Sequence, residues 1–242
     1  MNLLEYISDP NRDFATGEVI LVDKPLTWTS FNAVNKIKHS IKNHPSFTKD
    51  GVKLKARVGH AGTLDPLATG LLIICTGKKT KEIENYQGMK KVYTGTFFIG
   101  ATTPCFDLEK EVDATFPTEH ITKELILEKV KTFVGEQQQT PPLFSAIKVK
   151  GQRAYNIARA GNDVELKSRS ITIESFEITK IEMPGVSFKI TCSKGTYIRS
   201  IARDLGIALN SGAHLTSLRR EKIGDFDVEN AIDMPAKSNK LD

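Results

Sequence analysis

The chain has 242 residues, of which 39% are hydrophobic and 26% are charged, a balance that is ordinary for a globular protein. This length allows one large domain or two unequal ones, with a core that buries about 70–75% of the unfolded surface. The longest apolar run, Gly70 to Cys75, is far too short to cross a membrane. The N-terminus carries acids where a signal peptide would be basic, and three scattered cysteines indicate neither disulfides nor zinc. We therefore expect a soluble cytoplasmic protein.

The net charge of +5 is unevenly distributed along the chain. Residues 51–100 carry a net charge of +5 and residues 141–224 carry +7, whereas residues 101–140 between them carry −4. If the two basic blocks meet in space, they form a positive face of the kind that binds a polyanion. The alternative interpretation is that these lysines and arginines only solvate surface helices.

Hydrophobic periodicity and turn residues predict a mixture of strands and helices. The first part of the chain is predicted to hold a strand at 17–22 ending in the turn Asp23-Lys24-Pro25, a helix at 31–41 capped by Thr29 or Ser30, a mobile polar loop at 44–53, a further loop at 57–70, a buried strand or short helix at 71–75, and a helix at 80–86. The remainder is predicted to hold a strand at 91–99, helices at 122–134 and 155–160, a hairpin of strands at 171–182 and 186–192, and a helix at 197–209. This order indicates an α/β chain with a mixed sheet.

The densest signal for chemistry is the segment Gly59 to Gly70, which reads GHAGTLDPLATG. Its glycines permit tight backbone paths and the close approach of a ligand, and Asp65 is the one carboxylate among them. Taken alone, Asp65 before a proline is typical of a helix cap or turn. His60 alone is likewise more often a structural hydrogen-bonding residue than a catalyst.

Two further clusters contain candidate functional residues. Cys192 to Arg199 ends a strand, turns at Gly195 and opens a helix, which places Tyr197 and Arg199 near the helix start. Tyr93 lies near the start of the aromatic strand at 91–99. The simpler interpretation is that the tyrosines fill the core and that Arg199 makes a surface ion pair.

Together the three clusters resemble the TruB family of tRNA pseudouridine synthases, which act on uridine 55 of the T-loop. The resemblance extends from about Gly17 to Asp233, and GHAGTLDPLATG is its most specific stretch. Supporting stretches are VDKPLTWTS, KVYTGTFFIGATT, TPPLFSAIKVKGQRAYNIAR, CSKGTYIRSIARDLG and GAHLTSLRR. The resemblance implies a pseudouridine synthase fold of α+β type, with a mixed, largely antiparallel sheet flanked by helices. It also implies a single catalytic domain over residues 1–242 with a thumb-like insertion around 120–165.

The resemblance assigns roles to individual residues. Asp65 is the catalytic aspartate, which either attacks C1′ of the ribose or removes a ribose proton. Tyr93 stacks on the flipped base, and Arg199 pairs with Asp65 and keeps its carboxylate charged. Tyr197 and Leu218 shape the uracil pocket. His60 stacks in the T-loop, in the space that the flipped base leaves. Lys24, Lys81 and Asp107 are supporting residues, and the two lysines hold phosphates or pair with acids.

The implied partner is the T-arm of tRNA, with no metal, organic cofactor, membrane or obligatory protein partner, and we expect a monomer. Many members of the family continue into a C-terminal PUA-type domain, but only about twenty residues follow Arg220 and their net charge is negative, so we expect none here. Two alternatives are an RNA-binding module without catalysis and a guide-dependent ribonucleoprotein subunit. The joint presence of Asp65, Tyr93 and Arg199 argues against the first, and the expected lack of a PUA domain argues against the second.

Overall fold

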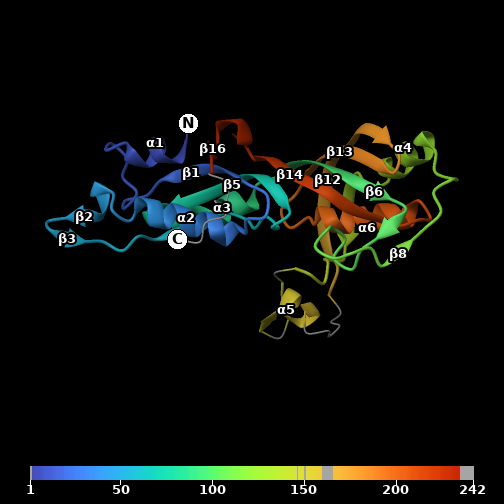
Figure 1. The fold of residues 1–242 in the computed structure, drawn as a ribbon, viewed down its shortest axis with the longest axis horizontal. Helices are drawn as coiled ribbons and strands as arrows, with labels where there is room; N and C mark the ends of the chain where they lie inside the picture. The colour runs from blue at the N-terminus through green and yellow to red at the C-terminus, as the bar shows by residue number, and fades with distance from the viewer. Residues whose placement is uncertain (1, 146, 150, 160–165, 235–242) are drawn as a thin grey trace. The chain divides into compact units, whose positions relative to one another are not determined.

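The computed structural model describes residues 2–145, 147–149, 151–159 and 166–234 (Figure 1). Its contacts divide the chain into two compact units. Unit 1 comprises residues 1–92 and 219–242, and unit 2 comprises residues 93–218. Two strands, β6 (Lys91–Ile99) and β14 (Ala213–Ile223), contribute residues to both units. Within the described residues, every helix is too short or too polar to span a bilayer.

Unit 1 is built on the antiparallel pair of β1 (Val19–Lys24) and β5 (Ala68–Thr76), in which Ile20 faces Ile74 and Val22 faces Leu72. The short strand β4 (Val58–His60) also pairs with β5, and β16 (Ile232–Asp233) runs parallel to β1. Almost every residue of β5 is buried, as expected for a run of β-branched and apolar residues inside a sheet.

The helix α2 (Ser30–Ile41) closes one core of unit 1. Its buried residues Ala33, Val34, Ile37 and Ile41 recur at helical spacing and join the cluster that contains Ile20 and Leu72 (Figure 1). Thr29 caps this helix by accepting from the amide of Asn32, and Asn32 in turn accepts from the amide of Thr29. The other short elements of unit 1 are α1 (Leu3–Ser8), η1 (Pro45–Phe47), β2 (Thr48–Lys49), β3 (Val52–Lys53), η2 (Gly77–Glu82), α3 (Ile83–Gly88), β15 (Phe226–Asp227) and η3 (Val228–Asn230).

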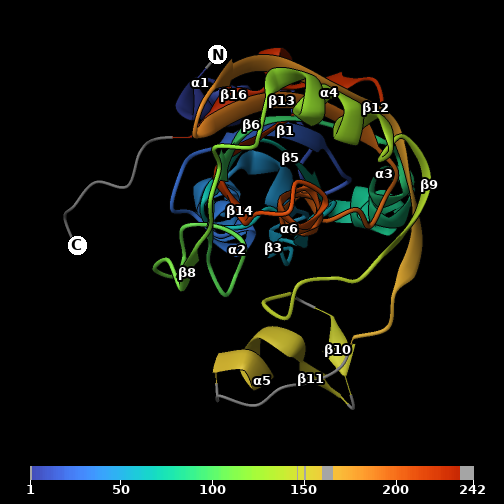
Figure 2. The same cartoon turned by 90° about the vertical axis from the view of Figure 1, so that its right-hand side faces the viewer.

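Unit 2 holds the strand order β14-β6-β13-β12-β9, with β12 (Arg169–Glu182) and β13 (Gly185–Cys192) forming a long antiparallel hairpin (Figure 2). Its core contains the stacked rings of Phe97 and Phe188, whose centroids lie 4.1 Å apart. The helix α6 (Ile198–Ala208) packs its apolar face into this core. The other elements are β7 (Ala101–Thr102), β8 (Ala114–Thr115), α4 (Lys123–Lys131), β9 (Gly135–Gln139), β10 (Lys148–Val149), β11 (Gln152–Arg153) and α5 (Ala154–Arg159).

The predicted fold class is confirmed, since the sheet is mixed and mostly antiparallel and carries flanking helices. The ambiguous segment 71–75 is a strand, and the helix predicted at 80–86 is α3 preceded by the 3-10 turn η2. The predicted helix at 155–160 is α5, although residue 160 lies outside the described residues. The expected thumb-like insertion around 120–165 also ends outside them and stays a prediction, as does the single domain.

Three local predictions were wrong, and two strands were missed. The expected turn residues Asp23 and Lys24 belong to β1, because they continue the ladder with β5 up to Gly70. The segment 44–53 holds η1 and the hairpin β2–β3 rather than only a loop, and 57–70 contains β4 and the start of β5. The strands β9 and β14 were not predicted. The run GEQQQ of β9 is polar, and its Gln139 is buried by hydrogen bonding rather than by hydrophobicity.

Candidate active site

Asp65 lies in the turn between β4 and β5 and is partly buried. The residue before it, Leu64, is held by the hydroxyl of Ser30 at the start of α2. Ser30 Oγ accepts from the Leu64 amide at 2.9 Å and donates to the Leu64 carbonyl at 3.2 Å. The amide and the carbonyl of Leu64 are both hydrogen-bonded to one buried side chain. This fixes the position of Leu64 and constrains the backbone of Asp65, the next residue.

The other side of Asp65 is held by the segment after β1. The amide of Thr27 donates to the Pro66 carbonyl at 2.8 Å, and Thr27 takes a φ of 69°. A β-branched residue is strained in this left-handed region, so the surrounding structure must hold it there. The turn that carries Asp65 is therefore fixed on both sides, by the Ser30 hydroxyl on one side and the Thr27 amide on the other.

Arg220 on β14 fixes the ends of the same segment. Its side chain is 1% exposed, with Nε donating to the Leu71 carbonyl at 2.7 Å and one terminal nitrogen donating to the Gly62 carbonyl at 3.2 Å. The backbones of Gly70 and Arg220 approach so closely that a Cβ on Gly70 would lie 2.3 Å from the Arg220 carbonyl oxygen. Gly70 also has a φ of 101°, so glycine is required there on two counts.

Lys24, at the end of β1, is fully buried, and its ammonium donates to the carbonyls of Pro25 at 2.9 Å and Trp28 at 2.7 Å. The pKa of Lys24 is lowered to about 8, mainly by burial; the negative charge of Asp65 opposes this shift and the positive charge of Arg220 adds to it. Lys24 thus lies within electrostatic reach of both Asp65 and Arg220. A buried cation therefore acts on the Asp65 carboxylate.

His60, at the end of β4, is half-buried, and burial lowers its pKa. The positive charge of Arg220 lowers this pKa further, and a backbone hydrogen bond involving Gly62 raises it. Its Nδ1 is buried without a hydrogen-bond partner in the described part of the chain. Burial and the positive charge of Arg220 both favour a neutral imidazole. A neutral ring suits stacking better than a charged ring does.

In unit 2, Arg199 is almost completely buried at the start of α6. Its guanidinium lies 3.6 Å from the carboxylate of Asp107 and donates to the carbonyls of Cys105 at 3.2 Å and Phe144 at 2.9 Å. Asp107, predicted only as a supporting residue, is therefore an ion-pair partner of Arg199. The predicted pair of Arg199 with Asp65 joins residues of different units and stays a prediction.

Tyr197 precedes α6 and is held through its backbone. Its amide donates to Gln139 Oε1 at 2.8 Å, and its carbonyl accepts from Gln139 Nε2 at 3.1 Å. The guanidinium carbon of Arg169 lies 4.7 Å from the centroid of the Tyr197 ring, and a terminal nitrogen of the same group donates to the Gly195 carbonyl. A buried glutamine and a stacked arginine thus fix the position of the tyrosine.

The other predicted residues are placed as follows. Tyr93 on β6 and Leu218 on β14 are partly buried against the core of unit 2. Lys81 lies exposed on η2 in unit 1. Within unit 1, Lys24 lies within electrostatic reach of Asp65 and Arg220, and His60 lies within reach of Arg220. Within unit 2, Arg199 pairs with Asp107.

Sequence reasoning missed the residues that position these side chains. Ser30 was noted only as a possible helix cap, Arg220 only as part of a matching stretch, and Gln139 not at all. No local signal pointed to Arg220, because β14 was not predicted and its sequence AHLTSLRREKI is rich in charged residues. No group of three or more potential metal ligands occurs among the described residues.

Comparison with known proteins adds independent evidence. Residues 49–198 match the model of the TruB family pseudouridylate synthase N-terminal domain. A tRNA pseudouridine synthase B of Flavobacterium johnsoniae is 60% identical over 222 residues, covering 92% of this chain and 95% of the relative. One of Bacteroides fragilis is 52% identical over 225 residues, covering 93% of this chain and 94% of the relative.

A solved structure of a Cbf5–Nop10–Gar1 complex contains a chain that is similar to this one, with a TM-score of 0.66 and 28% sequence identity. A structure of an H/ACA ribonucleoprotein bound to a substrate RNA gives a TM-score of 0.63 and 26% identity. The matches cover 92% and 91% of this chain but only 53% and 52% of those chains, so this chain spans about half their length.

Proposed function

The chain belongs to the TruB family of pseudouridylate synthases, and we propose that it isomerises uridine 55 in the T-loop of tRNA to pseudouridine. The observation that carries this proposal is the turn that holds Asp65. Its backbone is fixed from residues 27–30 and by Arg220, and the buried cation Lys24 lies within electrostatic reach of its carboxylate. The names of the relatives, whose lengths this chain covers almost completely, support tRNA as the substrate.

The proposed reaction is an isomerisation that needs one carboxylate. The bond between N1 of uracil and C1′ of ribose breaks, the uracil turns, and a new bond forms between C5 and C1′. The proton on C5 then leaves for solvent and N1 gains a proton, so no atoms are lost overall. We assign Asp65 either to attack on C1′ or to removal of a ribose proton, since both need an ionised carboxylate.

The target uridine must leave its stack to reach Asp65, and stacking on protein side chains offsets that cost. We propose that Tyr93 stacks on the flipped uracil and that Arg199 pairs with Asp65. We further propose that Tyr197 and Leu218 shape the uracil pocket. The half-buried, neutral ring of His60 suits the proposed stacking in the space that the base leaves. Lys81, which is exposed, is proposed to hold a phosphate, whereas Lys24, which is fully buried, is proposed to pair with an acid.

The test is tritium release from tRNA labelled at C5 of uridine, followed by mapping of the modified site. We expect Asp65→Asn to abolish release while tRNA binding stays within about three-fold of wild type, because binding is spread over many basic residues. Asp225→Asn, an exposed aspartate in the turn after β14, is the matched control and should keep full activity. Substantial release by Asp65→Asn would contradict the assignment.

The same assay tests the proposed partners. We propose that the chain acts on tRNA in the cytoplasm as a monomer, without a guide RNA or an obligatory protein partner. The structural neighbours come from complexes with other proteins, so the alternative is a subunit that needs such partners. Purified chain alone should modify unfractionated tRNA at one site. Activity only after addition of a protein or guide RNA would support the alternative.

A further inference from the structure

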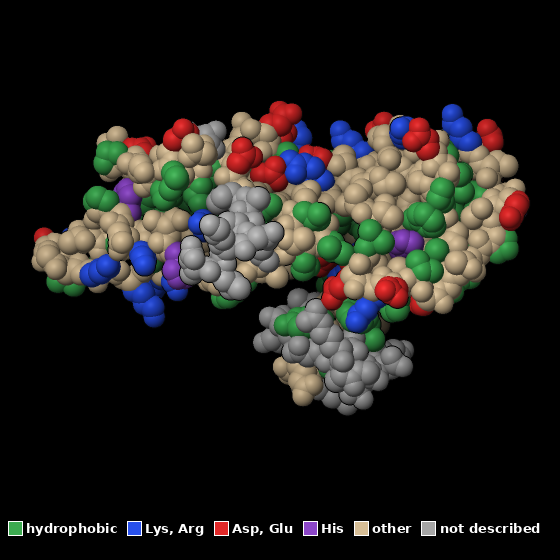
Figure 3. All heavy atoms as spheres, in the orientation of Figure 1, with side chains coloured by type: hydrophobic (Ala, Val, Ile, Leu, Met, Phe, Trp, Pro, Cys, Tyr) green, Lys and Arg blue, Asp and Glu red, His purple; other side chains and the backbone are tan. Residues whose placement is uncertain are grey.

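The segment 42–57 between α2 and β4, which we call the basic arm, has a charge unlike that of the rest of unit 1. It carries five lysine or arginine residues and one acid, Asp50. All five basic side chains are exposed, namely those of Lys42, Lys49, Lys53, Lys55 and Arg57. Basic side chains and histidines gather over β2, β3 and α2 in the space-filling view (Figure 3).

The basic arm contains a well-defined β-hairpin. Asp50 and Gly51 both take positive φ, 50° and 77°, which is the backbone of the two-residue turn that Asp-Gly favours. The strands β2 and β3 pair across this turn, and the Leu54 amide continues the pairing by donating to the Phe47 carbonyl at 2.7 Å. Phe47 is itself 2% exposed and belongs to the core of unit 1. The hairpin is thus joined to the core through its own base.

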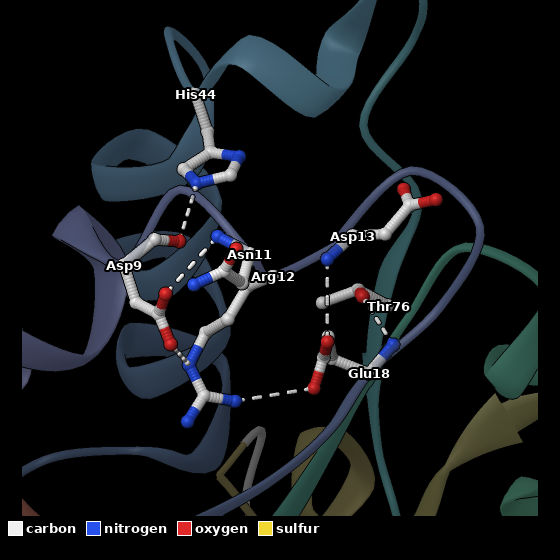
Figure 4. A network of polar contacts seen from close by, with 7 residues as sticks. All are labelled: Asp9, Asn11, Arg12, Asp13, Glu18, His44 and Thr76. Carbon is white, nitrogen blue, oxygen red and sulfur yellow. Dashed lines mark hydrogen bonds and ion pairs between the residues drawn. The ribbon is translucent and has the colours of Figure 1, made fainter.

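His44 anchors the other end of that base (Figure 4). Its ring is buried, donates through Nε2 to the Asp9 carbonyl at 3.1 Å and packs edge-on against Phe14. Asp9 in turn pairs with Arg12, which pairs with Glu18 just before β1. The arm is therefore tied to the N-terminal segment and the sheet before any ligand binds, which reduces the ordering cost of binding.

The positive charges of the arm are not neutralised by carboxylates of the described residues. Within the described residues, none of its five basic side chains is joined to a carboxylate, and Lys53 makes only a long contact of 3.5 Å with Asn43 Oδ1. Some other cations of unit 1 do have carboxylate partners, as Lys79 has Glu82 and Arg219 has Asp23. A row of exposed, unpaired lysines repels itself, and a polyanion relieves that repulsion.

We propose that the basic arm binds the phosphate backbone of the RNA double helix that carries the substrate loop. This inference rests on the proposed function, because it needs RNA at Asp65. The arm leads directly into β4 and the Asp65 turn, and the eight residues from Asp50 to Arg57 can extend about 20–25 Å away from β4. The charges of the arm therefore lie away from the reacting base, in the region where the helical stem continues beyond the substrate loop.

Charge also favours RNA over a protein partner. Two apolar side chains on the arm are exposed, Val52 by 63% and Leu54 by 41%, but they alternate with Lys53 and Lys55. Protein interface cores are depleted of lysine, whereas phosphate contacts require cations. Phosphate contacts carry no sequence information, so the arm is expected to add affinity without changing which uridine is modified.

The experiment measures binding of stem-loops that share one substrate loop but have stems of about five or about twelve base pairs. Wild type should bind the longer stem about ten-fold more tightly at moderate salt. The variant Lys49→Gln/Lys53→Gln/Lys55→Gln should bind both stems alike. Its plot of log affinity against log salt for the longer stem should be shallower by about two to three units. Turnover at saturating RNA should match wild type.

The control variant Lys123→Gln/Lys129→Gln/Lys131→Gln removes the same charge from α4, in the acidic segment 101–140, and should keep the preference for the longer stem. Arginines at the three arm positions should also keep it. Equal losses for both stems, or none, would overturn the inference. If wild type turns over its substrate but the arm variant binds both stems as wild type does, the inference fails and the proposed function stands. If wild type shows no turnover, the proposed function fails.

Discussion

The basic arm and the Asp65 turn are neighbours along the chain of unit 1, yet they use positive charge in opposite ways. Lys24 and Arg220 are buried, and each donates to two backbone carbonyls. The lysines of the arm are exposed and make no ion pairs within the described residues. The buried cations therefore fix protein geometry, and the exposed ones are available to a ligand.

This difference separates two physical regimes. Interactions of buried charges are strong and barely screened by salt, but each charge must be fully hydrogen-bonded to offset its desolvation. Exposed charges act through counterion release, so their effect falls steeply with salt. If the comparison holds, changes at buried cations alter stability and turnover, and changes at exposed cations alter binding alone.

The largest effect is expected from Arg220→Ala, which leaves the Leu71 and Gly62 carbonyls without this donor and opens a cavity. We expect a loss of about 4 kcal/mol of unfolding free energy, equivalent to roughly 8–16 °C in Tm. Calorimetry or urea unfolding measures it, and Arg219→Ala, which removes a more exposed arginine next in sequence, is the control. A loss no larger than that of the control would show that the buried guanidinium does not hold the turn.

A second effect comes from the depressed pKa of Lys24. The folded pKa is about 8 and the unfolded value is about 10.5, so between these pH values the unfolded chain holds a proton that the folded chain has released. Stability contributed by this group therefore rises as pH increases from 8 to 10.5, by up to about 3 kcal/mol. The difference in unfolding free energy between wild type and Lys24→Met should rise over that range, and parallel curves would contradict the assignment.

A smaller effect is expected from Ser30→Ala, which removes both hydrogen bonds to the Leu64 backbone. Stability should fall by about 2 kcal/mol, because a buried amide loses its partner. If the hydroxyl positions Asp65, kcat should fall more than KM rises, and Ser30→Thr should restore part of it. Ser211→Ala, which removes a buried serine of unit 2 that donates to Pro117, should lower stability without lowering kcat. If Ser30→Ala and Ser211→Ala have the same kcat, the Ser30 hydroxyl has only a structural role.

The sequence predicted those parts of unit 1 whose signal is local. Helix α2 begins where Thr29 caps it, and the alternating aromatic run at 91–99 is the strand β6. The hairpin of the arm was missed, although Asp50-Gly51 is the turn signal for it, because apolar and polar residues alternate on only one side of that pair. Strand β14 was missed because its AHLTSLRREKI run mixes buried and exposed charges.

The candidate site was predicted residue by residue from motifs, but its support was not. Asp65, His60 and Lys24 stand in recognisable stretches. Their positioning by Ser30 and Arg220 depends on contacts between residues 34 and 158 positions apart, which no local pattern records. Tertiary hydrogen bonds of this kind decide burial, and burial decides the pKa of Lys24, so the electrostatics of the site emerge only with the fold.

The smallest effect concerns the substrate itself and tests how far the exposed cations extend their influence. A natural T-arm stem-loop contains the target loop and the first part of the stem, so it should reach Asp65 and part of the basic arm. We expect its kcat/KM to lie within about 30-fold, or about 2 kcal/mol, of that of full-length tRNA at equal, moderate salt. Binding of both should weaken steeply with added salt, while kcat at saturation stays constant, because the buried cations that hold the turn are not screened. A preference for full-length tRNA well beyond this limit would mean that contacts outside the T-arm dominate recognition. If that preference also survived neutralisation of Lys49, Lys53 and Lys55, those contacts would lie elsewhere than on the basic arm.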